Sequence, residues 1–464
     1  MSFEFERLSG RDIAAGVRER RFSAVEVAEA LLARIERLNP HINAYTLVTA
    51  DRALQEAGQV DRAIAENRDP GPLAGAPYSV KNLFDLQGVV TLAGSKINRE
   101  NPPAAEDATV VARLKASGAV CLGATNMGEY AYDFVTINAH DGATHNPRDL
   151  SRSAGGSSGG SGASVAAGMG AFSLGTDTNG SVRVPASFCG AWGLKPTYGR
   201  LSRAGVFPFA GSLDTVGVIG RSVEDLALAM DCMSGPDPRD AVCGKGVPMP
   251  VLPELGRADH GLRVGVLGGY FEAGASPEAA AAVEAVAAAL SASARVELPH
   301  PQMARAAAYV ITAAEGGELH RERLAARAMD FDPSARDRFI AGVLTPAAWL
   351  LHAQRFRAWW KAQMAEVFTR FDVLLAPATP ISAPALDQQT FQFNGQEVPV
   401  RANVGLFTQP ITLIGLPVVA APIHSPGRMP IAVQLIGPPG SEAALLRAAR
   451  ALEISGVCSA PVAS

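Results

Sequence analysis

The sequence is poor in cysteine, and its cysteines lack the spacing that cysteine-based sites require. Five cysteines occur in 464 residues, and no two of them form a C-x-x-C pair. An odd number of widely separated cysteines argues against a disulfide scaffold and against a structural zinc site. We therefore expect reduced, mostly buried thiols.

Charged residues are also scarce, and no segment could cross a membrane as a helix. Asp, Glu, Lys and Arg make up 19% of the chain, and the formal net charge is −4. This balance excludes a general attraction to nucleic acid or to an anionic membrane. The long uncharged stretches at 154–176 and 403–427 are rich in Gly and Ser or interrupted by four prolines. Because the first residues also lack signal-peptide character, we expect a cytoplasmic protein without a direct nucleic-acid partner.

The periodicity of apolar residues indicates an α/β fold. Ser23-Ala-Val-Glu26 is a capping box, and apolar residues follow it at helical spacing. Alternation of strands and helices is typical of a largely buried sheet. We predict a single domain over residues 1–464 with a helical segment at 1–60. Strands are predicted at 77–80, 119–123, 263–267, 373–376, 418–421 and 430–437, and helices from 277, over 304–371 with a break near 330–334, and over 442–453.

The composition changes sharply at residues 151–196, where Gly and Ser predominate. Such composition is typical of disorder, but interleaved Val, Met, Phe and Trp predict a packed segment. Residues 155–159 match the G-x-S-x-G pattern of α/β-hydrolases. That mechanism needs a histidine base late in the chain, and His320, His352 and His424 do not lie in a suitable loop after a strand. We therefore disfavour it.

The same segment and its surroundings resemble the amidase signature family of Ser–Ser–Lys amide hydrolases. The resemblance implies an α/β/α fold, in which helices cover both faces of a large mixed sheet. It implies a catalytic core at 77–220, a variable helical region on the substrate side at 300–370, and neither metal nor organic cofactor. The motifs that carry it are Pro77-Tyr-Ser-Val-Lys81, the Gly/Ser-rich run 151–181, Thr125-Asn-Met-Gly-Glu129, Gly199-Arg-Leu-Ser202 and Ile431-Ala-Val-Gln434.

The residues of these motifs suit amide chemistry on physical grounds. Ser181 follows the turn Thr178-Asn179-Gly180, whose backbone N–H groups can converge on one oxygen. A lysine acts as a base only when it is neutral, which requires burial away from acids. Lys81 follows an apolar strand, and it is one of only six lysines among 41 basic residues.

Residue by residue, the resemblance implies Ser181 as nucleophile, Ser157 as a relay serine preceded by a cis peptide bond, and Lys81 as base. It implies that the proton of Ser181 passes through Ser157 to Lys81 and that water cleaves an acyl-enzyme. Ala131 falls where the family lines the acyl site with backbone. The backbone of four residues would form the oxyanion hole, namely Thr178, Asn179, Gly180 and Ser181.

Four residues near these motifs have different expected roles. Asp177 and Arg183 flank the nucleophile, and we expect a structural ion pair between them. The setting of Lys195 suggests a structural role as well. Asn179 stands where the family commonly has glycine, and Asn82 stands where aspartate is common after the lysine. The second change removes a negative charge that would keep Lys81 protonated.

Finer motifs resemble the 1-carboxybiuret hydrolase branch of the family. That branch releases ammonia from a small carboxylated urea derivative during cyanuric acid degradation. It works with a short helical partner similar to the C subunit of glutamyl-tRNA amidotransferase, so a homodimer or a heterotetramer is expected. A substrate carboxylate calls for an arginine or tyrosine at the acyl site, and the candidates are Tyr309 and Arg321, with His320 and Arg323 beside them.

Two other functions remain open from the sequence. The chain could be another amidase of the family, including the glutaminase (A) subunit of a tRNA-dependent amidotransferase. It could also be a catalytically silent binding subunit, whose mark would be the loss of Ser181, Ser157 or Lys81. None of these three residues is lost.

Overall fold

The computed structural model describes residues 3–246, 249–257 and 261–463, and one mixed sheet of eleven strands runs through this part of the chain. Its strands, in spatial order, are β1 (Tyr45–Val48), β3 (Val120–Thr125), β2 (Pro77–Lys81), β8 (Phe172–Asp177), β10 (Thr215–Gly220), β9 (Trp192–Lys195), β16 (Val418–Ile423), β17 (Ile431–Ile436), β13 (Val373–Pro377), β11 (Val264–Leu267) and β12 (Ala294–Val296). Short two-stranded sheets are formed by β4 (Ile137–Asn138) with β5 (Gly142–Ala143), β6 (His145–Asn146) with β7 (Asp149–Ser153), and β14 (Thr390–Phe393) with β15 (Gln396–Pro399).

The pairing of three central strands places their functional ends at one edge of the sheet. β2 and β8 are parallel, with Val80 opposite Leu174. β10 runs antiparallel to β8, with Thr215 opposite Asp177. The carboxyl ends of β2 and β8 and the start of β10 therefore lie side by side.

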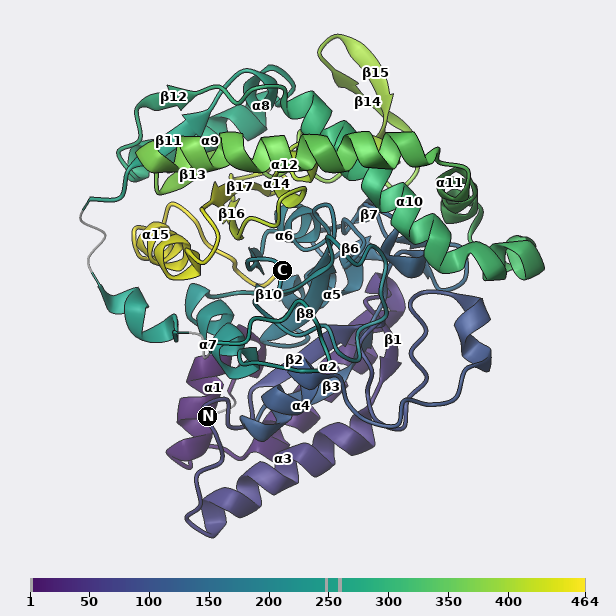
Figure 1. The fold of residues 1–464 in the computed structure, drawn as a ribbon. Coiled ribbons are helices and arrows are strands. Elements are labelled where there is room, and N and C mark those ends of the chain that lie inside the picture. Colours follow the sequence, from purple (N-terminus) through teal and green to yellow (C-terminus); the bar gives the residue numbers. More distant parts are fainter. Residues whose placement is uncertain (1–2, 247–248, 258–260, 464) are drawn as a thin grey trace.

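Helices cover both faces of the sheet, as expected from the sequence (Figure 1). On one face α4, α7, α9 and α15 share a hydrophobic core with strand residues such as Leu375. Its neighbour Leu374 points to the other face, where α6, α10 and α12 form a second core. The helices are α1 (Gly10–Arg18), α2 (Ala24–Ile42), α3 (Ala50–Ala65), α4 (Thr109–Ala116), α5 (Gly159–Ala166), α6 (Arg183–Cys189), α7 (Val223–Met233), α8 (Tyr270–Ala273), α9 (Pro277–Ala289), α10 (Pro301–Arg327), α11 (Pro333–Val343), α12 (Ala347–Arg370), α13 (Val400–Asn403), α14 (Gln409–Thr412) and α15 (Glu442–Ile454).

The helical region 304–371 is divided differently from the prediction. A break near 330–334 was expected, and it separates α10 from α11. A second break, at residues 344–346, separates α11 from α12. Pro346 explains it, because the residue before a proline is disfavoured in the helical conformation. The additional turn allows α11 to pack back against α10.

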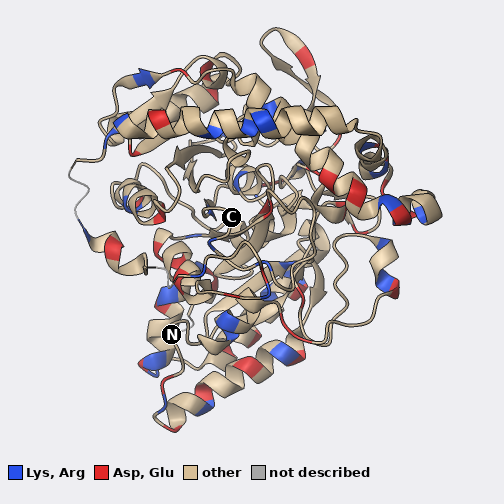
Figure 2. Cartoon of the chain, in the orientation of Figure 1, with Lys and Arg blue, Asp and Glu red and all other residues tan. Residues whose placement is uncertain are grey.

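Charged side chains concentrate on the outer helices, whereas the strands of the large sheet are almost free of them (Figure 2). Those strands hold four charged residues, namely Lys81, Asp177, Lys195 and Arg295, and the first three are fully buried. Buried charges are costly unless they are paired or neutralised. Lys81 and Asp177 both end strands at the edge described above, which marks this edge as a candidate functional site.

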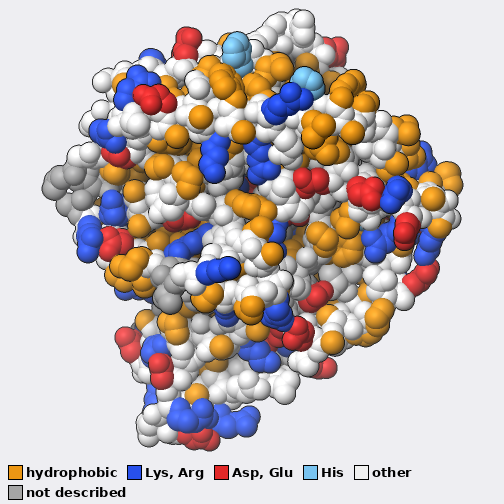
Figure 3. Space-filling model, viewed as in Figure 1, with side chains coloured by type: hydrophobic (Ala, Val, Ile, Leu, Met, Phe, Trp, Pro, Cys, Tyr) orange, Lys and Arg blue, Asp and Glu red, His pale blue; other side chains and the backbone are white. Residues whose placement is uncertain are grey.

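The outer face of α12 exposes large hydrophobic side chains between basic residues (Figure 3). Trp349 and Leu351 are 62% and 60% exposed, and Leu344, just before the helix, is 74% exposed. In the described part of the chain, no helix combines the length and the apolar character needed to span a bilayer.

Candidate active site

Lys81 contacts two hydroxyl groups at the buried end of β2. Its Nζ lies 2.7 Å from Ser157 Oγ and 2.9 Å from Thr176 Oγ1. All three residues are buried. Thr176 stands one residue before the end of β8, so the parallel pairing of β2 and β8 brings it to Lys81. The three groups form one hydrogen-bonded unit inside the protein.

The surroundings of Lys81 favour its neutral form. Burial lowers its pKa to about 7, while the negative charges of Asp214 and Asp177 act in the opposite direction. A neutral amine has a lone pair that can accept a proton from a neighbouring hydroxyl. Asn82, the residue after Lys81, donates instead to Thr46 Oγ1 at 2.7 Å.

Ser157 stands just before α5, where the chain is closely packed. The peptide bond between Gly156 and Ser157 is cis. Within α5, a Cβ at Gly160 would come within 2.4 Å of the backbone of Asn126. The glycines of this segment are therefore used for close approach of backbone to backbone, and they are not a sign of disorder.

A buried ion pair holds the turn between β8 and α6. Arg183 donates from Nε and from Nη2 to Asp177, each at 2.9 Å, and both side chains are fully buried. Burial alone would raise the pKa of Asp177, but Arg183 more than compensates and lowers it below its usual value. Asp177 also accepts from the backbone N–H of Gly180 at 2.7 Å and of Val182 at 3.2 Å. The expected structural ion pair is thus present.

The contact of Asp177 with Gly180 corrects one expectation about the oxyanion hole. The N–H of Gly180 is engaged by a carboxylate and does not point toward a substrate. Gly180 is required for another reason: its φ is +135°, and a Cβ there would lie 2.2 Å from Thr408 Oγ1. Among the described residues, no acceptor binds the N–H groups of Thr178, Asn179 or Ser181.

Ser181 opens onto a narrow cavity between the turn and α10. Its lining includes Ala131, Tyr132, Asp133, Phe134, Thr178, Asn179, Phe209, Tyr309, Thr312, Arg338 and Gln409. The free space is about 10 Å³, enough for one water molecule. A substrate therefore requires movement of rim side chains, and Tyr309, which is 42% exposed, lies at the rim.

Arg338, from α11, is a cationic group of this cavity that the sequence did not single out. Its guanidinium stacks on the ring of Tyr132, 3.6 Å from the centroid, and its Nη1 donates to the carbonyl oxygen of Tyr132 at 2.6 Å. Within the described ranges, no carboxylate forms an ion pair with Arg338. A half-buried, unpaired guanidinium beside Ser181 can bind an anionic group of a ligand.

The structure brings together most of the residues suggested by the sequence, but not all. Tyr309 and Ala131 line the cavity with Ser181. Arg321 lies outside it, 61% exposed at its side chain and paired with Glu318 at 3.1 Å. His320 is packed against the ring of Tyr130, with 4.0 Å between the ring centroids, and burial lowers its pKa to about 3. Neither Arg321 nor His320 lies at the cavity.

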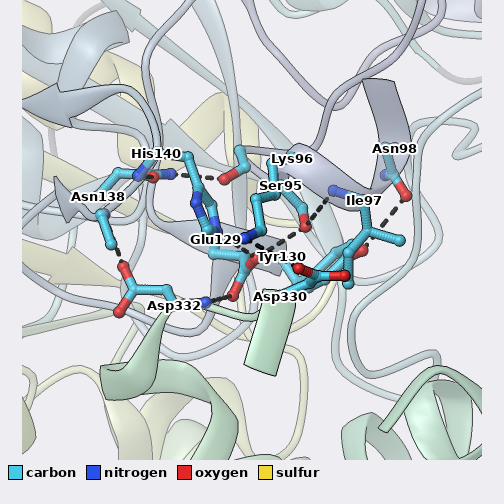
Figure 4. A network of polar contacts seen from close by, with 12 residues as sticks. Ser95, Lys96, Ile97, Asn98, Glu129, Tyr130, Asn138, His140, Asp330 and Asp332 are labelled. Carbon is cyan, nitrogen blue, oxygen red and sulfur yellow. Dashed lines mark hydrogen bonds and ion pairs between the residues drawn. The ribbon is translucent and has the colours of Figure 1, made fainter. Parts of the chain in front are cut away.

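A polar network anchors the loop that carries Ala131 (Figure 4). Glu129 is at its centre: it accepts from Ser95 Oγ at 2.7 Å, contacts His140 Nε2 at 2.9 Å and accepts from the backbone N–H of Asp332 at 2.7 Å. Asp332 caps the N-terminus of α11, the helix of Arg338. Glu129 thus ties together two walls of the cavity.

A second cavity, of about 180 Å³, adjoins the first and shares Ala131 and Phe209 with it. Thr176 and Asp214 also line it. Asp214 accepts from Thr178 Oγ1 at 2.7 Å and from the N–H of Phe209 at 2.8 Å. It therefore holds the turn before Ser181 in place. No motif in the sequence identified this residue.

The fold and this hydroxyl–lysine site define a class of enzyme. The family model described as Amidase matches residues 26–446. The chain belongs to the amidase family, whose signature motifs it carries, and it is a hydrolase that acts on C–N amide bonds.

Individual relatives narrow this class. The chain is 53% identical over 449 residues to AtzE, the 1-carboxybiuret hydrolase protein of Pseudomonas sp. (strain ADP), covering 96% of this chain and 98% of that protein. It is 37% identical to the glutamyl-tRNA(Gln) amidotransferase A protein of Carboxydothermus hydrogenoformans, covering 97% of each. A solved structure described as a vestigial protein complex that reveals the origins of an s-triazine catabolic enzyme matches with a TM-score of 0.96 and 52% identity, over 97% of this chain and 99% of the other.

Proposed function

We propose that this amidase releases ammonia from 1-carboxybiuret or a closely similar carboxylated urea-type amide. The observation that carries the proposal is the 53% identity to the 1-carboxybiuret hydrolase protein AtzE over almost the full length of both chains. The amidotransferase relatives are more distant, at 37% to 38% identity. We also propose that residues 1–464 act as a single amidase domain.

Lys81, Ser157 and Ser181 perform the chemistry in this proposal. Neutral Lys81 takes a proton from Ser157 across their 2.7 Å contact, and Ser157 takes one from Ser181 as its Oγ attacks the amide carbonyl. The proton then returns along the same path to the leaving nitrogen, and ammonia departs. A water molecule, deprotonated through the same groups, cleaves the resulting acyl-enzyme.

The developing oxyanion is stabilised by backbone N–H groups of the turn before α6. Those of Thr178, Asn179 and Ser181 are the proposed donors, because that of Gly180 is bound to Asp177. Donors held in advance by a rigid turn lose no energy to reorganisation when charge develops. Asp177, Arg183 and Asp214 supply that rigidity.

Arg338 binds the carboxylate of the substrate in this proposal. It lines the cavity of Ser181 and has no carboxylate partner of its own in the described structure. Its stacking on Tyr132 fixes the plane of the guanidinium. A planar group of this kind can bind a carboxylate through two parallel hydrogen bonds.

We further propose that the enzyme works with a short helical partner similar to the amidotransferase C subunit, as a homodimer or a heterotetramer. Support comes from the relatives, one of which was solved as a protein complex. The hydrophobic side chains exposed on α12 are consistent with a protein partner.

The direct test is ammonia release by the purified protein across a panel of amides. The panel contains freshly generated carboxybiuret, biuret, glutamine, asparagine and a simple aliphatic amide, and Ser181→Ala serves as control. We expect the highest kcat/KM for carboxybiuret and no release by the control. A preference for glutamine would favour an amidotransferase-type glutaminase and would contradict the proposed substrate.

A further inference from the structure

Asn179 presents a buried polar atom that has no partner in the cavity of Ser181. The residue is 7% exposed and lines the cavity two positions before Ser181. Among the residues that the structure describes, none forms a hydrogen bond with its Oδ1. A buried acceptor without a donor is costly, so its presence beside the nucleophile needs an explanation.

The side chain of Asn179 is held in place on both sides. Its Nδ2 donates to Thr312 Oγ1 of α10 at 2.8 Å. Its backbone carbonyl oxygen accepts from Thr408 Oγ1 at 2.6 Å. Because Nδ2 is already used, the amide leaves Oδ1 as the atom available to a ligand.

An amide oxygen only accepts hydrogen bonds, so the ligand must supply the donor. A carboxylate is excluded at this point, since two acceptors would face each other, and it is directed instead toward Arg338. A saturated carbon chain next to the scissile carbonyl has no donor to offer. A urea-type substrate does, because an N–H replaces the CH₂ at that position.

We propose that Asn179 selects urea-type substrates by accepting a hydrogen bond from the N–H adjacent to the scissile carbonyl. Asn179 is then a specificity-determining residue, and Thr312 is a positioning residue that orients its amide. The inference rests on the proposed function, because it takes the cavity of Ser181 as the acyl site. A site built to accept from this N–H rejects the CH₂ analogue, which leaves Oδ1 unpaired.

Two stable ligands isolate this one contact. N-carbamoylglycine and succinamate each carry a carboxamide and a carboxylate, and they differ by one NH for one CH₂. Their dissociation constants can be measured by calorimetry in the Ser181→Ala protein, which removes turnover. We expect N-carbamoylglycine to bind about tenfold or more tightly than succinamate.

In the double variant Ser181→Ala/Asn179→Gly, the two ligands should bind nearly equally. Thr312→Val on the same background should weaken the preference in part, because it frees the amide of Asn179. Thermal denaturation of each variant checks that the fold is kept, and Thr312→Val provides a second reading if the glycine variant is unstable.

A preference that survives in Asn179→Gly overturns the proposal. So does the absence of a preference in the parent, including undetectable binding of both ligands. Failure of the proposed function is a separate result, since the ammonia panel reports the preferred amide. If that panel favours another amide while the NH preference still depends on Asn179, the proposed function fails and this inference stands.

Discussion

Two lysines are completely buried in the central sheet, and only one of them has the neighbours of a catalytic base. Lys81 ends β2 and Lys195 ends β9, and burial lowers the pKa of each to about 7. Lys81 Nζ contacts the hydroxyls of Ser157 and Thr176. Lys195 Nζ donates to the carbonyl oxygen of Pro196 at 2.8 Å.

The comparison teaches that a lowered pKa does not by itself identify a base. Both lysines can be neutral near pH 7, but proton transfer requires a donor hydroxyl within hydrogen-bond reach. Only the surroundings of Lys81 provide a hydroxyl that leads toward Ser181. The predictions below test this difference, from the largest expected effect to the smallest.

Loss of the nucleophile should have the largest effect. Ser181→Ala should lower kcat by about 10⁴-fold or more, because no other hydroxyl replaces it in the attack. The melting temperature should stay close to that of the wild type, since the substitution removes a single oxygen. Steady-state ammonia release and thermal denaturation check the two expectations, and full activity in a folded variant would contradict the assignment.

The two lysines should respond very differently to substitution. Lys81→Ala should lower kcat by about 10³- to 10⁴-fold, which is the range for the loss of a general base. The matched variant Lys195→Met, which keeps an apolar stem of similar length, should retain kcat within a few-fold. Equal losses in both folded variants would remove the distinction between them.

Loss of the proposed carboxylate anchor should have an intermediate effect. Arg338→Met should lower kcat/KM for a carboxylated urea by roughly 10- to 100-fold, mainly through KM, because a charged hydrogen bond is lost. A neutral amide should be affected much less. The ratio of kcat/KM for the two substrates measures this, and a uniform loss would indicate that Arg338 is structural.

The smallest effect should come from Asp214, which acts on Lys81 through charge. Its carboxylate raises the pKa of Lys81, whereas it is not among the groups that shift the pKa of Lys195. Asp214→Asn should therefore move the acidic limb of the pH–rate profile to lower pH, by roughly one unit or less. A shift to higher pH would contradict this account of the electrostatics.

The sequence predicted the groups that lie in motifs, and it missed those brought in from distant segments. Lys81, Ser157 and Ser181 were found because each follows a recognisable local pattern. Arg338 and Asp214 reach the site only through the packing of α11 and of the loop before β10, and no local pattern marks them.

The expectation for Arg321 shows why spacing along a helix matters. Tyr309 and Arg321 are twelve residues apart on α10, which corresponds to a rotation of about 120° and a rise of about 18 Å. Both side chains cannot face one small cavity. The mixed sheet and its two helical layers followed from the order of strands and helices, but the second break, at residues 344–346, was not predicted.

The pH dependence of kcat/KM, measured for the wild type beside Lys195→Met, tests the central claim most directly. If Lys81 is the base, activity should be low when this lysine is protonated, rise by about tenfold per pH unit below pH 7, and level off above it. Lys195→Met should show the same limb at the same pH. Loss or displacement of the limb in Lys195→Met would assign the titration to the other buried lysine and would contradict the account.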